Sequence, residues 1–169
     1  MAKLVDIIGR ALSGEWGEDD TSGDGIPVLR TTNFTNDGIV NYENVVTRNI
    51  TKKKLDDKYL RPGDIIIEKS GGSDKQPVGR VIYFEGPENT YLFNNFTGLL
   101  RIRDFSHWCP KYVFYALFFN CLTNRQRIQE EVFGEYTITL PPMEIQEQFA
   151  AFVEQTDKSK LYGAMEVAA

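Results

Sequence analysis

The sequence has few of the side chains that enzymes use as reactive groups. Its 169 residues include one histidine, His107, and two cysteines, Cys109 and Cys121. Hydrolysis or group transfer needs at least a nucleophile with a base, a pair of carboxylates or a metal cage. The chain has no GxSxG, HExxH, Walker or dinucleotide-binding motif, and it is too short to add a cofactor domain for methyl transfer. The sequence therefore favours a binding module over an enzyme.

Cysteine spacing and the length of the apolar runs further restrict the class of protein and the kinds of site that the sequence supports. Cys109 and Cys121 lie too far apart for a CxxC pair and have only His107 nearby, so we expect buried free thiols rather than a metal site or a disulfide. The acidic cluster at residues 18–20 lacks the ligand spacing of a calcium loop and is expected to be a solvated turn. Apolar runs such as residues 112–119 are far shorter than the roughly 20 residues that cross a bilayer, and no signal layout opens the chain. We expect a cytoplasmic protein.

Charge is unevenly distributed along this acidic chain. The net charge of −5 argues against a protein that coats nucleic acid nonspecifically. Residues 45–103 nevertheless carry eleven Lys/Arg against seven Asp/Glu, a net charge of +4, while the blocks before and after them carry −5 and −4. This distribution is compatible with one positive face on an acidic protein, although an ordinary solvated surface has the same composition.

Short strand patterns interspersed with helical ones predict a mixed α/β fold of the α+β kind. We expect a twisted, mostly antiparallel sheet with helices packed around it and one C-terminal helix projecting from the globule. Proline and glycine at residues 61–64 predict a tight turn. Helices are expected over residues 3–12, 52–59 (capped by Thr51), 111–132 and 143–162, and strands over residues 26–34, 45–47, 65–67, 78–84, 91–93, 98–103 and 136–140.

The loop within residues 68–84 carries side chains suited to nucleic acid. Gly71 and Gly72 let the backbone approach a partner closely. The donors suited to phosphate oxygens and base edges are Lys69, Ser70, Ser73, Lys75, Gln76 and Arg80. A solubilising hairpin loop has a similar composition, so the residues alone leave both interpretations open.

Several separate stretches, taken together, match one family. Residues 60–72 read LRPGDIIIEKSGG, and VGRV follows at residues 78–81. Residues 138–150 read ITLPPMEIQEQFA, and the opening helix with Gly14 precedes PVLRTTNF at residues 27–34 and Asp37-Gly38. In this order, and over nearly the whole chain, they resemble the target recognition domain of the specificity subunit of type I restriction-modification systems and the entrance to its long spacer helix.

This resemblance implies a subunit that reads DNA sequence without catalysis of its own and directs methylation or cleavage by its partners. In such systems modification subunits methylate adenine with S-adenosylmethionine and a motor subunit cleaves. We therefore expect no cofactor on this chain, and S-adenosylmethionine, ATP and magnesium on the partner subunits. Carried onto this chain, the DNA-contact candidates are Arg30, Thr31, Thr32, Asn33, Lys69, Ser70, Gly71, Gly72, Ser73, Lys75, Gln76 and Arg80.

The resemblance also divides the chain into a DNA target recognition domain, residues 1–140, and a truncated spacer helix, residues 141–169. Spacing by four and three residues along that helix predicts a coiled-coil-like docking seam of Ile145, Phe149, Phe152 and Thr156. With one recognition domain the chain resembles a half-subunit, which would pair with itself or with another half to read a split site. The expected partners are double-stranded DNA, modification subunits, the restriction motor subunit and a second copy of the chain, with no membrane.

One departure from the family keeps other hypotheses open. Residues 130–136 pass directly into the strand at 136–140, where family members usually have a glycine-containing loop and a short helix. A second hypothesis is therefore a docking or regulatory fragment, or a decayed copy, that no longer binds DNA. A small enzyme of unknown type is a third. Salt dependence of DNA binding separates the first two, because phosphate contacts release counterions.

Overall fold

Three consecutive isoleucines, Ile65, Ile66 and Ile67, lie at the centre of the fold. They belong to β6 (Ile65–Glu68) in the computed structural model, which describes residues 1–52, 54–71, 78–119 and 136–167, with side chains as far as Thr156. Successive side chains of a strand point to opposite faces. Accordingly, Ile65 and Ile67 pack in one core cluster with α1 and α2, and Ile66 packs in another with residues of the second sheet. The continuous apolar run is explained by a sheet that is covered on both faces.

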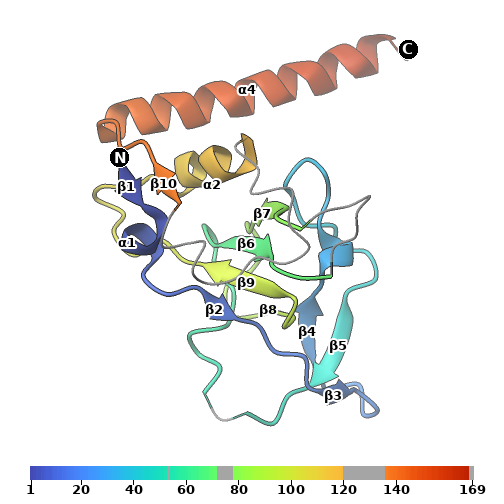
Figure 1. Cartoon of the computed structure of the whole chain (residues 1–169). Coiled ribbons are helices and arrows are strands. Elements are labelled where there is room, and N and C mark those ends of the chain that lie inside the picture. The colour runs from blue at the N-terminus through green and yellow to red at the C-terminus, as the bar shows by residue number, and fades with distance from the viewer. Residues whose placement is uncertain (53, 72–77, 120–135, 168–169) are drawn as a thin grey trace.

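The described residues form two four-stranded sheets and one two-stranded sheet (Figure 1). In the first, neighbouring strands are antiparallel in the order β2 (Leu12–Ser13), β9 (Thr97–Leu100), β6 and β7 (Val81–Tyr83). The second has the order β3 (Glu18–Asp19), β5 (Val46–Asn49), β4 (Ile26–Leu29) and β8 (Leu92–Phe93), with a parallel pairing of β4 and β8. β1 (Ala2–Lys3) pairs with β10 (Thr137–Ile138).

Helices cover the first sheet on the face that Ile65 and Ile67 share. α1 (Leu4–Ile8) and α2 (Pro110–Phe119) supply apolar side chains to that core cluster. α4 (Met143–Val167) crosses α2 on the side away from the two large sheets (Figure 1). The strand predicted over residues 26–34 ends early: β4 stops at Leu29, and after Arg30 a short 3-10 helix, η1 (Thr31–Asn33), follows. The α+β class and the mostly antiparallel pairing are thus confirmed, although the strands divide into three sheets rather than one.

Local turn chemistry was predicted correctly at residues 61–64. The Asp64 N–H donates to the Arg61 carbonyl at 3.0 Å, and Gly63 has φ +94°. A positive φ at the third position is what a type II turn requires, and glycine adopts it without strain. β6 begins directly after this turn, at Ile65.

The predicted helix over residues 3–12 is too long. α1 ends at Ile8 because Gly9 has φ +70°, and a Cβ at Gly9 would lie 2.6 Å from the Arg103 Cζ atom. Leu12 then pairs with Leu99 in β2 and β9 instead of continuing the helix. The apolar spacing that suggested a helix at Leu12 comes from a strand that faces the core.

Three further local predictions differ from the structure. The described part of residues 52–59 forms one turn, with the Tyr59 N–H bonded to the Leu55 carbonyl at 3.1 Å, and Leu55 packs with Val28 and Leu92. The acidic cluster is not a turn, because Glu18 and Asp19 form β3 against β5. Cys109 is a free thiol, half-buried rather than buried. Cys121 and the predicted helix beyond Phe119, up to residue 132, lie outside the described residues, as do most of the residues 130–136 that depart from the family.

Candidate nucleic-acid interface

The first predicted contact segment, residues 30–33, is held in place by Asn33. The Asn33 side chain is 1% exposed. Its Oδ1 accepts the Arg30 N–H at 2.9 Å, and its Nδ2 donates to the Asn41 and Glu43 carbonyls at 2.9 and 3.2 Å. Thr32, between them, is exposed. Asn33 therefore shapes the segment from inside, and Thr32 presents it to solvent.

The second predicted segment begins where β6 ends. The N–H groups of Lys69 and Ser70 both donate to the Phe96 carbonyl, at 2.8 and 3.2 Å. Lys69 Nζ donates to Ser13 Oγ at 2.8 Å, and Gly71, with φ +95°, is exposed. The predicted residues Gly72, Ser73, Lys75 and Gln76 lie outside the described residues.

Arg80 joins the two segments. Its Nε donates to Glu68 Oε2 at 3.0 Å, and its Nη2 and Nη1 donate to the Thr31 and Phe34 carbonyls at 3.2 and 3.3 Å. The guanidinium also lies 5.9 Å from the centroid of the Phe34 ring. A planar guanidinium suits such a multi-branched contact because its donors form a fixed fork. Two segments that were predicted separately are therefore adjacent in the structure, with Arg80 between them.

A third segment, residues 94–97, lies against the other two and was missed by the sequence analysis. The Asn94 N–H donates to the Leu29 carbonyl at 2.9 Å, directly before the first segment. Thr97 closes the turn by donating from its N–H and its Oγ1 to the Asn94 carbonyl, at 3.1 and 2.8 Å. The available signal was the Asn94-Asn95 pair, since asparagine favours turns. The three segments form what we call the loop face: residues 30–34, 69–71 and 94–97.

Charge on the basic central block is largely paired within the molecule. The forked guanidinium of Arg101 binds Asp64 at 2.7 and 2.8 Å, and Lys52 binds Glu15 at 2.7 Å. Burial raises the pKa of Glu15, but the hydrogen bonds from Lys52 and Lys58 outweigh it and hold that pKa below its ordinary value. Paired cations of the block are Arg48, Lys52, Lys58, Arg61, Arg80 and Arg101. Six cations of the block are therefore neutralised by carboxylates within the protein.

The predicted docking seam lies on α4, largely exposed. Ile145, Phe149 and Phe152 are exposed, with Phe152 at 67%. Phe149 also meets the Tyr112 ring edge-on, with the ring centroids 5.8 Å apart, and Thr156 Oγ1 donates to the Phe152 carbonyl at 2.9 Å. The neighbouring face of the helix is buried against the globule through Gln146, Ala150 and Val153. One face of α4 thus packs against the globule, while the seam stays largely exposed to solvent.

Comparison with known protein families decides the assignment. A family model described as "Type I restriction modification DNA specificity domain" matches residues 3–162, which is nearly the whole chain. The chain belongs to this family. Its members are DNA specificity domains, so the resemblance drawn from the LRPGD and LPP segments is confirmed. A search of curated proteins found no match.

Two solved structures share the fold of this specificity domain. One comes from a study of complex assembly and conformational transition of the type I R-M system, with a TM-score of 0.68 and 18% identity. The other is the HsdS subunit from Thermoanaerobacter tengcongensis, with a TM-score of 0.53 and 18% identity. The alignments cover 94% of this chain but 38% and 37% of those chains. The specificity domain therefore spans less than two fifths of their length.

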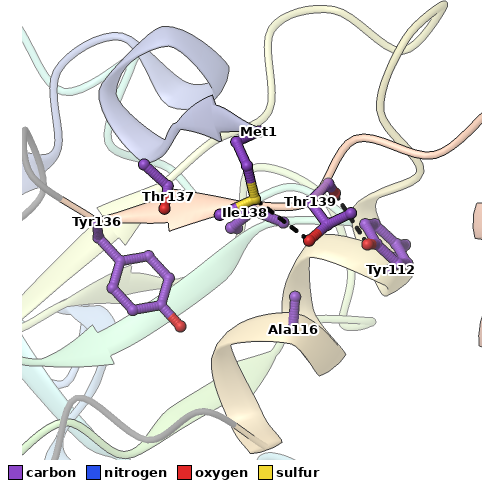
Figure 2. Close-up of a pocket in the computed structure, with 7 residues that line it drawn as sticks. All are labelled: Met1, Tyr112, Ala116, Tyr136, Thr137, Ile138 and Thr139. Carbon is purple, nitrogen blue, oxygen red and sulfur yellow. Dashed lines mark hydrogen bonds between the residues drawn. The ribbon is translucent and has the colours of Figure 1, made fainter.

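A pocket of about 490 Å³ lies away from the loop face, between α2 and the β1–β10 pair. Figure 2 shows its seven lining residues, among them Tyr112, whose hydroxyl donates to the Thr139 carbonyl at 2.9 Å. The lining contains no carboxylate, amine, imidazole or thiol side chain. Among the described residues, no group of His, Cys, Asp or Glu side chains is arranged to hold a metal ion, and no helix is long and apolar enough to cross a membrane.

Proposed function

We propose that this specificity domain reads DNA sequence through its loop face and carries no catalysis of its own. The observation that supports this most strongly is the Arg80 contact with Glu68, Thr31 and Phe34, because it unites two segments rich in polar and basic side chains. Phosphate contacts position a protein on the duplex and contacts to base edges supply specificity. The three adjacent loops of the loop face offer side chains suited to phosphates as well as side chains suited to base edges.

Residues on and beside the loop face take contacting and positioning roles. Lys69 supplies a cation for a phosphate, while Thr32 and Ser70 supply hydroxyl groups for phosphates or base edges. Arg80 and Asn33 position the loops: Arg80 donates to the Thr31 and Phe34 carbonyls, and Asn33 Nδ2 donates to the Asn41 carbonyl. Gly72, Ser73, Lys75 and Gln76 remain predicted DNA contacts beyond the described residues.

Docking to partner subunits is assigned to the seam on α4. We infer that residues 141–169 belong to a spacer helix that contacts modification subunits, and through them the motor subunit, or pairs with a second copy of the chain. The exposed Ile145 and Phe152 support this, since exposed apolar side chains on one helix face are typical of helix association. S-adenosylmethionine, ATP and magnesium would then be bound by the partners.

A second candidate function is a docking fragment that no longer binds DNA. Internal pairing of the basic block favours it, because cations paired with buried carboxylates such as Asp64 and Glu68 contribute little to a phosphate-binding surface. Selection from a random duplex library at two salt concentrations, with and without a modification subunit, separates the two. An enriched half-site whose affinity falls with salt supports reading; a bound modification subunit without any enrichment supports docking alone.

A further inference from the structure

Phe96 stands out among the residues of the loop face. Its side chain is 49% exposed, although phenylalanine is normally buried. It lies in the turn at residues 94–97, which no apolar pattern of the sequence analysis covered. We infer that Phe96 is a specificity-determining residue that packs against the methyl group of a thymine in the half-site. The inference rests on the proposed function and names one contact within it.

The backbone of Phe96 is tied to one DNA-contact segment and its turn to the other. Its carbonyl accepts both the Lys69 and the Ser70 N–H groups. Two residues earlier, the Asn94 N–H binds the Leu29 carbonyl, next to Arg30. The backbone of Phe96 therefore lies at the junction of the two predicted segments, and its exposed ring is accessible to DNA that binds there.

The turn that carries Phe96 is firmly held. Thr97 is completely buried and makes two hydrogen bonds to the Asn94 carbonyl. β9 begins at Thr97 and pairs with β6, so the turn is continuous with the central sheet. An aromatic side chain with two rotatable bonds on such a turn orders at low entropic cost when a partner covers it.

The chemistry of base edges selects the partner group. In the major groove each base presents hydrogen-bond donors and acceptors, and the thymine methyl is the apolar group among them. Lys69 and Ser70, directly beside Phe96, are suited to the phosphates and polar edges around it. Covering one methyl group with an apolar ring strengthens binding about fourfold.

A double-mutant cycle tests the inference on the half-site enriched by the wild-type chain. Each thymine of that duplex is replaced in turn by deoxyuridine, which lacks the methyl group, and affinities are measured for wild type and Phe96→Ala. We expect one position where deoxyuridine weakens wild-type binding about fourfold. Phe96→Ala should weaken binding to the unmodified duplex by the same factor and be indifferent to deoxyuridine at that position.

Phe105→Ala is the matched control, because Phe105 is also exposed but follows the opposite end of β9. It should bind like wild type and keep the sensitivity to deoxyuridine. Unchanged affinity of Phe96→Ala, a half-site without thymine, or an unaltered deoxyuridine effect in Phe96→Ala would each overturn the inference while leaving DNA reading intact. Failure of the wild-type chain to enrich any site would overturn the proposed function itself, and the inference with it.

Discussion

The side-chain amide of Gln146 binds the backbone of Cys109: its Oε1 accepts the Cys109 N–H at 3.0 Å. The same amide donates from Nε2 to the carbonyls of His107 and Pro141, at 2.8 and 3.0 Å, and is 0% exposed. Lys111 adds ion pairs to Glu154 on α4 and to Glu85 beyond β7. The glutamine of the LPP segment thus fixes α4 on the globule, while the seam on the neighbouring face stays largely exposed.

Replacing Gln146 tests this fixation. Gln146→Leu removes the side-chain partner of the Cys109 N–H and of the His107 and Pro141 carbonyls, and should destabilise the fold by about 1–3 kcal/mol in total. Gln146→Glu keeps the acceptor but faces the two carbonyls with a carboxylate, so its loss of stability should shrink as acid protonates the side chain. Urea denaturation across pH measures both. Gln148→Leu, an exposed neighbour bonded to Glu144, should be nearly neutral; an equal loss there would contradict the account.

Lys69→Ala should weaken DNA binding and flatten its dependence on salt. A phosphate contact releases a counterion, so removing one lowers the slope of log affinity against log salt concentration by about one. Titrations of a labelled duplex at several salt concentrations give the slope. The control is Lys3→Ala, an exposed lysine on β1, and Lys75→Ala extends the test to the loop beyond Gly71. Equal slope changes in Lys69→Ala and Lys3→Ala would contradict a phosphate contact at the loop face.

Arg80→Lys keeps the charge but loses the forked contact between the two segments. We expect weaker DNA binding even though the net charge is unchanged, together with a stability loss of about 1–3 kcal/mol because Glu68 and two carbonyls lose donors. Arg61→Lys is the matched control, since Arg61 pairs with Glu88 at 3.7 Å near the surface. If Arg80→Lys binds DNA like wild type, Arg80 does not position the segments.

Glu15 should make stability depend on pH on the acid side. Its pKa is lowered in the folded state from the ordinary value of 4.5 by hydrogen bonds to Lys52 and Lys58, which outweigh burial. A lowered pKa adds stability that is fully present above 4.5 and is lost as the pH falls through the folded pKa. Denaturation of wild type and Glu15→Gln between neutral and acid pH should therefore converge in acid. Glu18→Gln, on exposed β3, should keep the wild-type profile; a constant gap between wild type and Glu15→Gln would contradict the pairing.

The docking seam is tested by Ile145→Asp with Phe152→Asp. Both side chains are exposed, so the globule should remain folded while binding to a modification subunit is lost. Ala151→Asp places the same charge at another exposed position of α4 and should bind normally. Loss of the fold in the double variant, seen by circular dichroism, would show that these side chains belong to the core.

Sequence reasoning succeeded where structure depends on near neighbours. The turn at residues 61–64 and the strand of Ile65 to Ile67 follow from proline, glycine and β-branched residues close in sequence. It failed where distant residues decide, as at Gly9, whose close neighbour is Arg103. At the site, the sequence indicated two candidate segments, and their union through Arg80 and the position of Phe96 depend on tertiary contacts that sequence reasoning does not reach.

The most direct test of the central claim is site-specific crosslinking of the chain to its selected duplex. A photoreactive side chain is placed at Thr32 or Ser70 on the loop face, or at Phe105 beyond the other end of β9, and crosslinked nucleotides are mapped. Our account predicts crosslinks from Thr32 and Ser70 to defined nucleotides of the half-site and none from Phe105. Efficient crosslinking from Phe105, with none from Thr32 and Ser70, would contradict it.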